Sequence, residues 1–189
     1  MKRLICFILV FVSLFSFAGC KKDKNNTDKN GVDIKYYASL GQMPECEYKI
    51  GTPVADIKND LTAEENNKSE QDHDHETYQI IEGAKSVLID CGSFGYYYLK
   101  EKESSGISYI VNYGKAYGFE TGTLITDVKT ALGELKYSEE AITSENAFFM
   151  LTAGGTLLKC SFEKHTVLFV FENNALCSTA IYLTEDWQN

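Results

Sequence analysis

A stretch of eleven residues occurs twice in this chain, and it limits the folds that the chain can adopt. GTPVADIKNDL begins at Gly51, and GTLITDVKTAL begins at Gly122, 71 positions later. Gly, Thr, Asp, Lys and Leu occupy the same places in both copies. Internal similarity of this kind marks a repeated structural unit. The sequence therefore predicts one domain made of two related halves.

Each copy has the pattern of a short amphipathic helix. Apolar residues fall on one side of a helix at positions 54, 57 and 61, and again at 125, 128 and 132. Thr52 is a suitable N-cap, Pro53 suits the first helical turn, and Gly133 is a suitable stop for the second helix. An additional helix is predicted within VDIKYYASLGQM, residues 32–43.

Four strands are predicted after each helix. Runs rich in Tyr, Phe, Val and Ile are separated by short turn sequences, which favours antiparallel hairpins. Polar connections, 62–76 and 133–146, precede each set of strands. The predicted strands cover residues 77–82, 86–91, 94–100, 107–113, 147–152, 156–162, 166–172 and 177–184. We expect an α+β fold in which two tandem units, each a helix and a four-stranded antiparallel meander, form one curved sheet with helices on one face.

The N-terminus has the features of a bacterial lipoprotein signal. Lys2 and Arg3 precede an apolar run of 14 residues, 4–17, which is shorter than the roughly 20 residues of a membrane-spanning helix. The sequence FAGC, ending at Cys20, resembles a lipobox. The resemblance implies cleavage before Cys20 and a diacylglycerol on its thiol, which together with acylation of the new amino terminus supplies stable anchoring. An ordinary signal peptide followed by a chance cysteine is the alternative.

The polar composition of the residues after Cys20 separates the N-terminal signal from the folded domain. Residues 21–31, KKDKNNTDKNG, contain no large apolar side chain and predict a disordered tether. Removing residues 1–19, which carry Lys2 and Arg3, takes the net charge from −9 to −11. An acidic domain does not suit nucleic acid, whose phosphates bind clustered Lys and Arg. We expect a signal peptide at 1–19, a tether at 20–33, a first repeat at 34–119 and a second repeat at 120–189.

Two motifs carry a further resemblance. Tyr48, Ile50, Gly51 and Thr52 form Y-x-I-G-T, and DVKTALGE covers residues 127–134. With the aromatic strands that follow, they resemble β-lactamase-inhibitor-protein-like domains and related uncharacterised exported proteins of Gram-positive bacteria, over residues 34–184. The resemblance implies an eight-stranded concave sheet backed by helices. In the inhibitor itself, an aromatic concave face grips an enzyme, but no contact residue can be matched here position by position.

Aromatic residues are predicted on both faces of the strands. Side chains alternate along a strand, and three runs, FGYYYLK, SYIVNY and TVLFVFE, are apolar on either side. Few helices are predicted, so one face is expected to retain exposed aromatics that mark an interaction site. Burial in the core is the alternative for each of them. The candidate partner-binding residues are Tyr96, Tyr98, Tyr109, Tyr113, Phe169 and Phe171.

Other motifs offer little support for catalysis. In DHDHE, His73 and His75 are candidate ligands for a divalent metal, and a solvated acidic turn is the alternative. Cys160 and His165 flank a predicted hairpin, but their diagonal placement and the lack of a third residue weaken a nucleophilic pair. Four cysteines outside the signal segment are either buried free thiols or disulfide partners with three possible pairings: Cys46, Cys91, Cys160 and Cys177.

These observations predict a function without catalysis. We expect a lipid-anchored extracytoplasmic protein that binds an exported or cell-envelope protein, as an inhibitor or an adaptor of an envelope enzyme. Contact with the membrane is expected through the lipid anchor alone, with no cofactor and no nucleic acid. The alternative is a binder of a small ligand, a wall fragment or a divalent metal.

Overall fold

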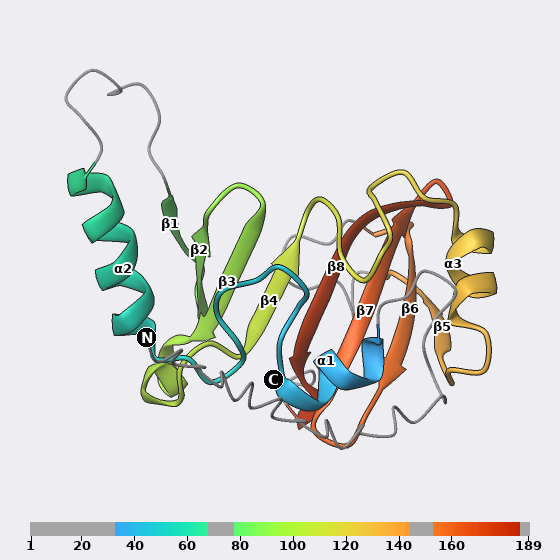
Figure 1. Cartoon of the computed structure of the whole chain (residues 1–189), viewed down its shortest axis with the longest axis horizontal. Coiled ribbons are helices and arrows are strands. Elements are labelled where there is room, and N and C mark those ends of the chain that lie inside the picture. Colours follow the sequence, from blue (N-terminus) through green and yellow to red (C-terminus); the bar gives the residue numbers. More distant parts are fainter. Residues whose placement is uncertain (1–32, 68–77, 144–152, 186–189) are drawn as a thin grey trace, which may run out of the picture.

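The computed structural model describes residues 33–67, 78–143 and 153–185, and its fold class is α+β, as the sequence predicts (Figure 1). Four helices accompany one open antiparallel sheet of eight strands. The helices are α1 (Ile34–Leu40), α2 (Val54–Asn67), the 3-10 helix η1 (Lys100–Ser105) and α3 (Ile125–Leu132). The strands are β1 (Gln79–Glu82), β2 (Ser86–Asp90), β3 (Phe94–Leu99), β4 (Tyr109–Asn112), β5 (Ser138–Ala141), β6 (Thr156–Ser161), β7 (His165–Glu172) and β8 (Ala175–Leu183).

The strand order places the two sets of four strands side by side. It runs β1-β2-β3-β4-β8-β7-β6-β5, so β4 and β8 meet in the middle while β1 and β5 form the edges. Every neighbouring pair is antiparallel, and the strands of each set are neighbours in chain order, with η1 between β3 and β4. At the central border, Ile110 lies opposite Ile181.

Local sequence explains where α1 and α3 begin and end. The Asp33 side chain accepts a hydrogen bond from the Tyr36 N–H (2.9 Å) at the start of α1, and Gly41 adopts a left-handed conformation (φ 66°) at its end. Gly133 follows α3, as predicted. The expected cap at Thr52 is not formed, because its Oγ1 accepts from the Lys49 N–H (3.2 Å) instead.

Two predicted boundaries are wrong, and both errors involve polar sequence. The helix α2 continues through Asn67, into the stretch predicted as a loop. The fifth strand is Ser138–Ala141, within the predicted connection, while the predicted strand 147–152 lies outside the described residues. Because β5 is an exposed edge strand with the sequence SEEA, it lacks the apolar pattern that identifies a buried strand.

The two copies of the repeated sequence form the same turn. Gly51 and Gly122 both have positive φ, 85° and 93°, which glycine adopts without strain. The N–H of Gly51 donates to the Ile107 carbonyl (2.8 Å), and the N–H of Ile107 donates back to Thr52 (3.0 Å). In the second copy, Gly122 and Thr123 exchange the same two bonds with Leu176, at 2.7 and 2.8 Å. Each turn thus ties the start of a helix to residues at the start of the last strand in its set.

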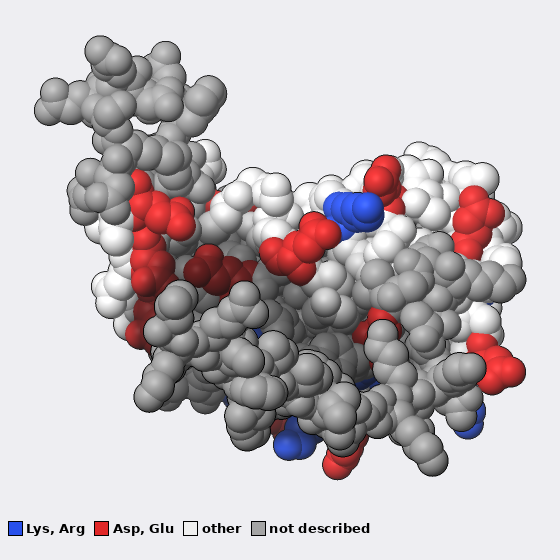
Figure 2. Space-filling view, viewed as in Figure 1, with Lys and Arg blue, Asp and Glu red and all other residues white. Residues whose placement is uncertain are grey.

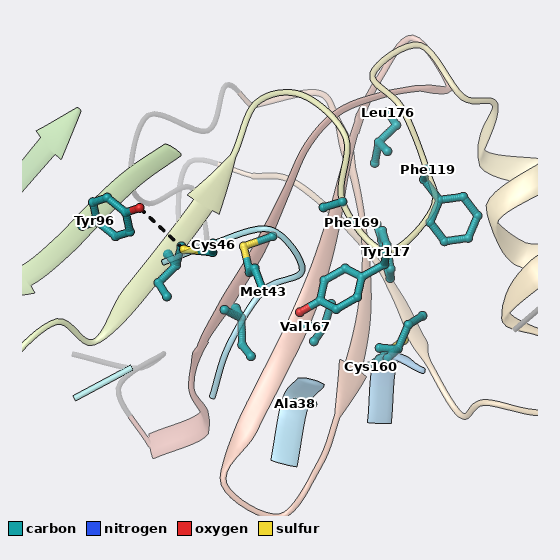
Figure 3. Close-up of a cluster of buried hydrophobic side chains, with 14 of the residues drawn as sticks. Ala38, Met43, Cys46, Tyr96, Tyr117, Phe119, Cys160, Val167, Phe169 and Leu176 are labelled. Carbon is teal, nitrogen blue, oxygen red and sulfur yellow. Dashed lines mark hydrogen bonds between the residues drawn. The ribbon is translucent and has the colours of Figure 1, made fainter. Parts of the chain in front are cut away.

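The main hydrophobic core lies between the three α-helices and one face of the sheet. Alternate strand residues, including Ile89, Ile110 and Val167, pack in one buried cluster with residues of α1, α2 and α3. Figure 3 shows part of this cluster, in which Ala38 of α1 lies near strand residues and the Tyr117 and Phe169 rings meet edge to face (6.2 Å between centroids). We call this side of the sheet the helix-packed face.

Candidate partner-binding face

Four of the predicted partner-binding residues belong to the helix-packed face. They are Tyr96, Tyr98, Phe169 and Phe171, all of them buried in the main core. The expectation that these rings stand exposed is therefore wrong. Each sequence run placed them correctly on one side of its strand, but the helices cover that side.

Two polar contacts hold the tyrosines of this core. The Tyr96 hydroxyl lies 3.6 Å from the Cys46 Sγ (Figure 3), and the Tyr98 hydroxyl accepts a hydrogen bond from Lys58 Nζ (3.3 Å). Lys58 also lies over the Tyr98 ring, 5.4 Å from its centroid. Since buried hydroxyls need such partners, these contacts indicate a packing role for Tyr96 and Tyr98.

The opposite side of the sheet carries a second apolar cluster, which we call the tyrosine face. Three tyrosines from adjacent strands form its centre. Tyr97 and Tyr109 are cross-strand partners whose rings meet edge to face (5.4 Å), and Tyr109 stacks on its own partner Tyr182 (5.8 Å). The members of the tyrosine face are Leu88, Tyr97, Tyr109, Val111, Leu168, Ala180 and Tyr182.

Among the side chains that the structure describes, none from α1, α2 or α3 belongs to the tyrosine face. Its side chains are nevertheless buried, with at most 6% of any of them exposed in the chain as a whole. Burial raises the pKa of Tyr97, Tyr109 and Tyr182, so their hydroxyls stay protonated at any physiological pH. The tyrosine face is thus an uncharged, buried cluster that includes three tyrosine rings with their hydroxyl groups.

Tyr113 forms the exposed rim of this surface. It follows β4 on the same side as Tyr109, and 37% of its side chain is exposed. Burial raises the pKa of Tyr97, and the adjacent Tyr113 raises it further. Gly95 makes room for this arrangement, because a Cβ there would lie 2.8 Å from Val111 Cγ1 and 3.3 Å from the Tyr113 hydroxyl. Of the six predicted partner-binding residues, Tyr109 and Tyr113 are the two on this side, and only Tyr113 is exposed.

The arrangement around Cys160 opposes the chemistry of an activated thiol. Cys160 lies opposite Val167 in the β6–β7 ladder, as predicted, and burial raises its pKa to about 12. His165 lies next to the C-terminal end of α1, where its ring is close to Gly41 and interacts with the Ala38 carbonyl. Burial lowers the pKa of His165, so both groups favour their neutral forms, whereas a nucleophilic pair needs thiolate and imidazolium.

The remaining predicted ligands and cysteines are placed as follows. His73, His75 and Cys20 lie outside the described residues. Among the residues that are described, no group of three or more His, Cys, Asp or Glu side chains could hold a metal ion. The four described cysteines are free thiols: Cys46, Cys91, Cys160 and Cys177.

Sequence reasoning missed Tyr97 and Tyr182, the residues that accompany Tyr109 on the tyrosine face. The signal was available in the alternation of FGYYYLK, which puts Tyr97 opposite its two neighbours. What the sequence did not reveal was the register between strands, which brings Tyr97, Tyr109 and Tyr182 into one row.

Comparison with known proteins gives no match to a family, to a curated protein or to a solved structure. Within the described ranges, no helix is both long and apolar enough to cross a membrane.

Proposed function

We propose that this chain is an extracytoplasmic binding module without catalytic activity, anchored by a lipid on Cys20, that engages an exported protein at the tyrosine face. The observation that supports this best is the division of the sheet. The helices α1, α2 and α3 pack on one side, and the tyrosine face on the other side contains none of their described side chains.

The chemistry of the tyrosine face suits a protein partner. Tyrosine rings supply apolar contact area, and their hydroxyls bind polar groups at the margin, which is why tyrosine is common in interfaces. The central side chains of the tyrosine face are at most 6% exposed. Tyr113 at the rim is exposed already and is therefore the expected first contact.

The charge of the molecule favours a basic or neutral partner. The net charge is −9 for the full chain and −11 without residues 1–19, and Figure 2 shows acidic side chains spread over the described part of the side on which α1 lies. Opposite charge on a partner accelerates encounter, whereas an acidic partner is repelled.

We further infer that the sheet arose from two tandem units of one helix and four strands. The repeated turns are separated by 71 positions, and the paired residues Ile110 and Ile181 are separated by the same 71 positions. If residues 71 positions apart are equivalent in the two units, Ile110 pairs with its own equivalent. A two-fold axis that passes between these two isoleucines and relates the units accounts for this pairing. This architecture agrees with the resemblance to β-lactamase-inhibitor-protein-like domains, which stays a prediction.

The proposed binding site can be tested by photo-cross-linking in cells. A benzophenone amino acid at position 113 of the full chain should form a covalent adduct with an exported protein. The same probe at Tyr36, which is exposed on α1, is the matched control. Binding of the captured protein should fall by roughly tenfold in Tyr113→Ala, about 1.4 kcal/mol, and stay unchanged in Tyr36→Ala. Equal capture at both positions, or none at 113, would contradict the proposed site.

The lipid anchor has a separate test. Radiolabelled palmitate fed to the cells should be incorporated into the wild-type chain and not into Cys20→Ala. Since the substitution removes the acylated thiol, the variant should appear in the soluble fraction. Labelling that persists in the variant would contradict anchoring at Cys20.

A further inference from the structure

The two edge strands of the sheet differ in a way that bears on self-association. All four residues of β1 are exposed, and they include Ile80 and Ile81, 45% and 43% exposed. Among the described strands, only β2 pairs with β1. The outer side of β1 therefore offers backbone N–H and carbonyl groups beside two exposed isoleucines, a combination that favours pairing with another strand.

The strand β5 at the other edge carries two carboxylates instead. Glu139 interacts with Lys129 (2.7 Å), and Glu140 interacts with Lys159 (3.2 Å). If two copies paired through the middle of β5, either Glu139 or Glu140 would lie directly opposite its own copy. Like charges directly opposite one another destabilise an antiparallel pair, so this edge disfavours self-pairing.

Symmetry restricts the ways in which β1 can pair with itself. In an antiparallel pair with a two-fold axis perpendicular to the sheet, one residue lies opposite its own copy, and opposed side chains share a face. Ile80 is on the helix-packed face, because it pairs with Ile89, and Ile81 points to the opposite side of the sheet, because it pairs with Leu88. The axis at the middle of β1 therefore passes through either Ile80 or Ile81.

The register centred on Ile80 is the more favourable of the two. It places Ile80 against Ile80 of the second copy, Gln79 against Ile81, and Tyr78 against Glu82. The register centred on Ile81 places Ile80 against Glu82, so a carboxylate lies beside an apolar side chain. In the first register no like charges are opposed, and Glu82 keeps its ion pair with Lys100 (2.9 Å).

We propose that a second copy of this chain pairs with the outer edge of β1, antiparallel, about a two-fold axis at Ile80. The pairing joins two sheets through their β1 edges. It also closes after two copies, because each sheet has a single β1 edge and β5 carries the two carboxylates. The pairing uses the outer edge of β1, whereas Tyr97, Tyr109 and Tyr182 lie on β3, β4 and β8, so the dimer is independent of the proposed partner site.

Cysteine cross-linking of the full chain in membranes tests the pairing and its register. Directly opposed side chains have Cβ atoms about 4.5–5.5 Å apart, near the range that a disulfide spans. Under a mild oxidant, Ile80→Cys should form a covalent dimer of the chain about tenfold more efficiently than Ile81→Cys, Glu139→Cys or the wild type. Ile81 is a matched control because its exposed fraction is nearly the same.

Every other result overturns the proposal. No dimer from Ile80→Cys, or equal dimer from Glu139→Cys, excludes pairing through β1. More dimer from Ile81→Cys excludes the register, and an adduct with a mass unlike twice the chain shows that another protein occupies the edge. As a second measurement, Ile80→Lys should weaken dimerisation of the full chain in detergent by at least about tenfold, measured by light scattering, because it opposes two like charges.

Discussion

Ile110 of β4 lies directly opposite Ile181 of β8, and both side chains are fully buried in the main core. These two residues occupy the border at which the two sets of strands meet. The border is short, since β4 and β8 share four residue pairs. The apolar contact at its centre is therefore expected to contribute strongly to the stability of the whole sheet.

We expect Ile110→Ala and Ile181→Ala each to lower the free energy of unfolding by about 2–5 kcal/mol, because each leaves a cavity in a packed core. The measurement is urea unfolding of the chain followed by circular dichroism. Ile81→Ala is the control at an exposed position, with an expected change of less than about 0.5 kcal/mol. A loss below about 1 kcal/mol for both buried variants would show that the border is not a stabilising contact.

A second prediction concerns two glycines with similar φ angles. Gly106 has φ 80° and Gly122 has φ 93°, but a Cβ at Gly106 would lie 2.4 Å from the Thr52 carbonyl oxygen, while a Cβ at Gly122 meets nothing within 4 Å. Gly122→Ala should therefore cost about 1 kcal/mol of unfolding free energy, from backbone strain alone. Gly106→Ala should cost at least about 2 kcal/mol more, because the turn after Gly51 has to move. Equal losses in thermal unfolding would contradict this reading of the contact.

The third prediction is a pH dependence caused by His165. Burial lowers its pKa below the ordinary value of 6.5, with a further lowering from Lys164, while the Ala38 carbonyl opposes the shift. His165 has the higher pKa in the unfolded chain, so near and below about pH 6.5 the unfolded chain binds more protons than the folded one. The free energy of unfolding is therefore expected to fall as the pH drops below about 6.5. His165→Gln should reduce the difference in urea midpoint between pH 7.5 and pH 5.5. An unchanged difference would show that carboxylates, and not His165, cause the acid sensitivity.

The fourth prediction concerns thiol reactivity. With a pKa of about 12, Cys160 has very little thiolate at pH 8, and its side chain is fully buried. Alkylation by iodoacetamide should be slower than for an unfolded cysteine by on the order of a thousandfold. Mass spectrometry of peptides, with and without urea, measures this ratio. Rapid labelling of Cys160 in the folded chain would be inconsistent with its place in the core.

Much of the sheet was predictable from the sequence, because buried strands carry a strong pattern. The runs that became β3 and β7 are apolar on both sides, and the structure packs them on both sides. Their alternation also predicted that Val167 and Phe169 share a side opposite Leu168. The helix α3 was predicted from its apolar spacing and from Gly133 as its stop, and α1 lies within residues 32–43, which were predicted as an additional helix.

The polar edges and the packing of the faces were not predictable in the same way. The strand β5 has no apolar period because it is exposed, and its place in the sheet depends on hydrogen bonds to β6. The burial of Tyr96 and Tyr98 could not be predicted from the alternation of side chains along the strand. Alternation assigns side chains to two sides of the sheet but does not show which side the helices cover. That choice depends on contacts between residues far apart in the chain, such as Lys58 with Tyr98.

The position of α1 makes the two sets of strands depend on each other. It precedes β1 in the chain, yet its residues Ile34 and Ala38 share the core with Val167 of β7, in the second set (Figure 1). The polypeptide thus reaches across the β4–β8 border at its beginning and returns to build the first set. A break in the connection between β4 and α3 would leave two fragments that still interlock, and each would lack part of its core when alone.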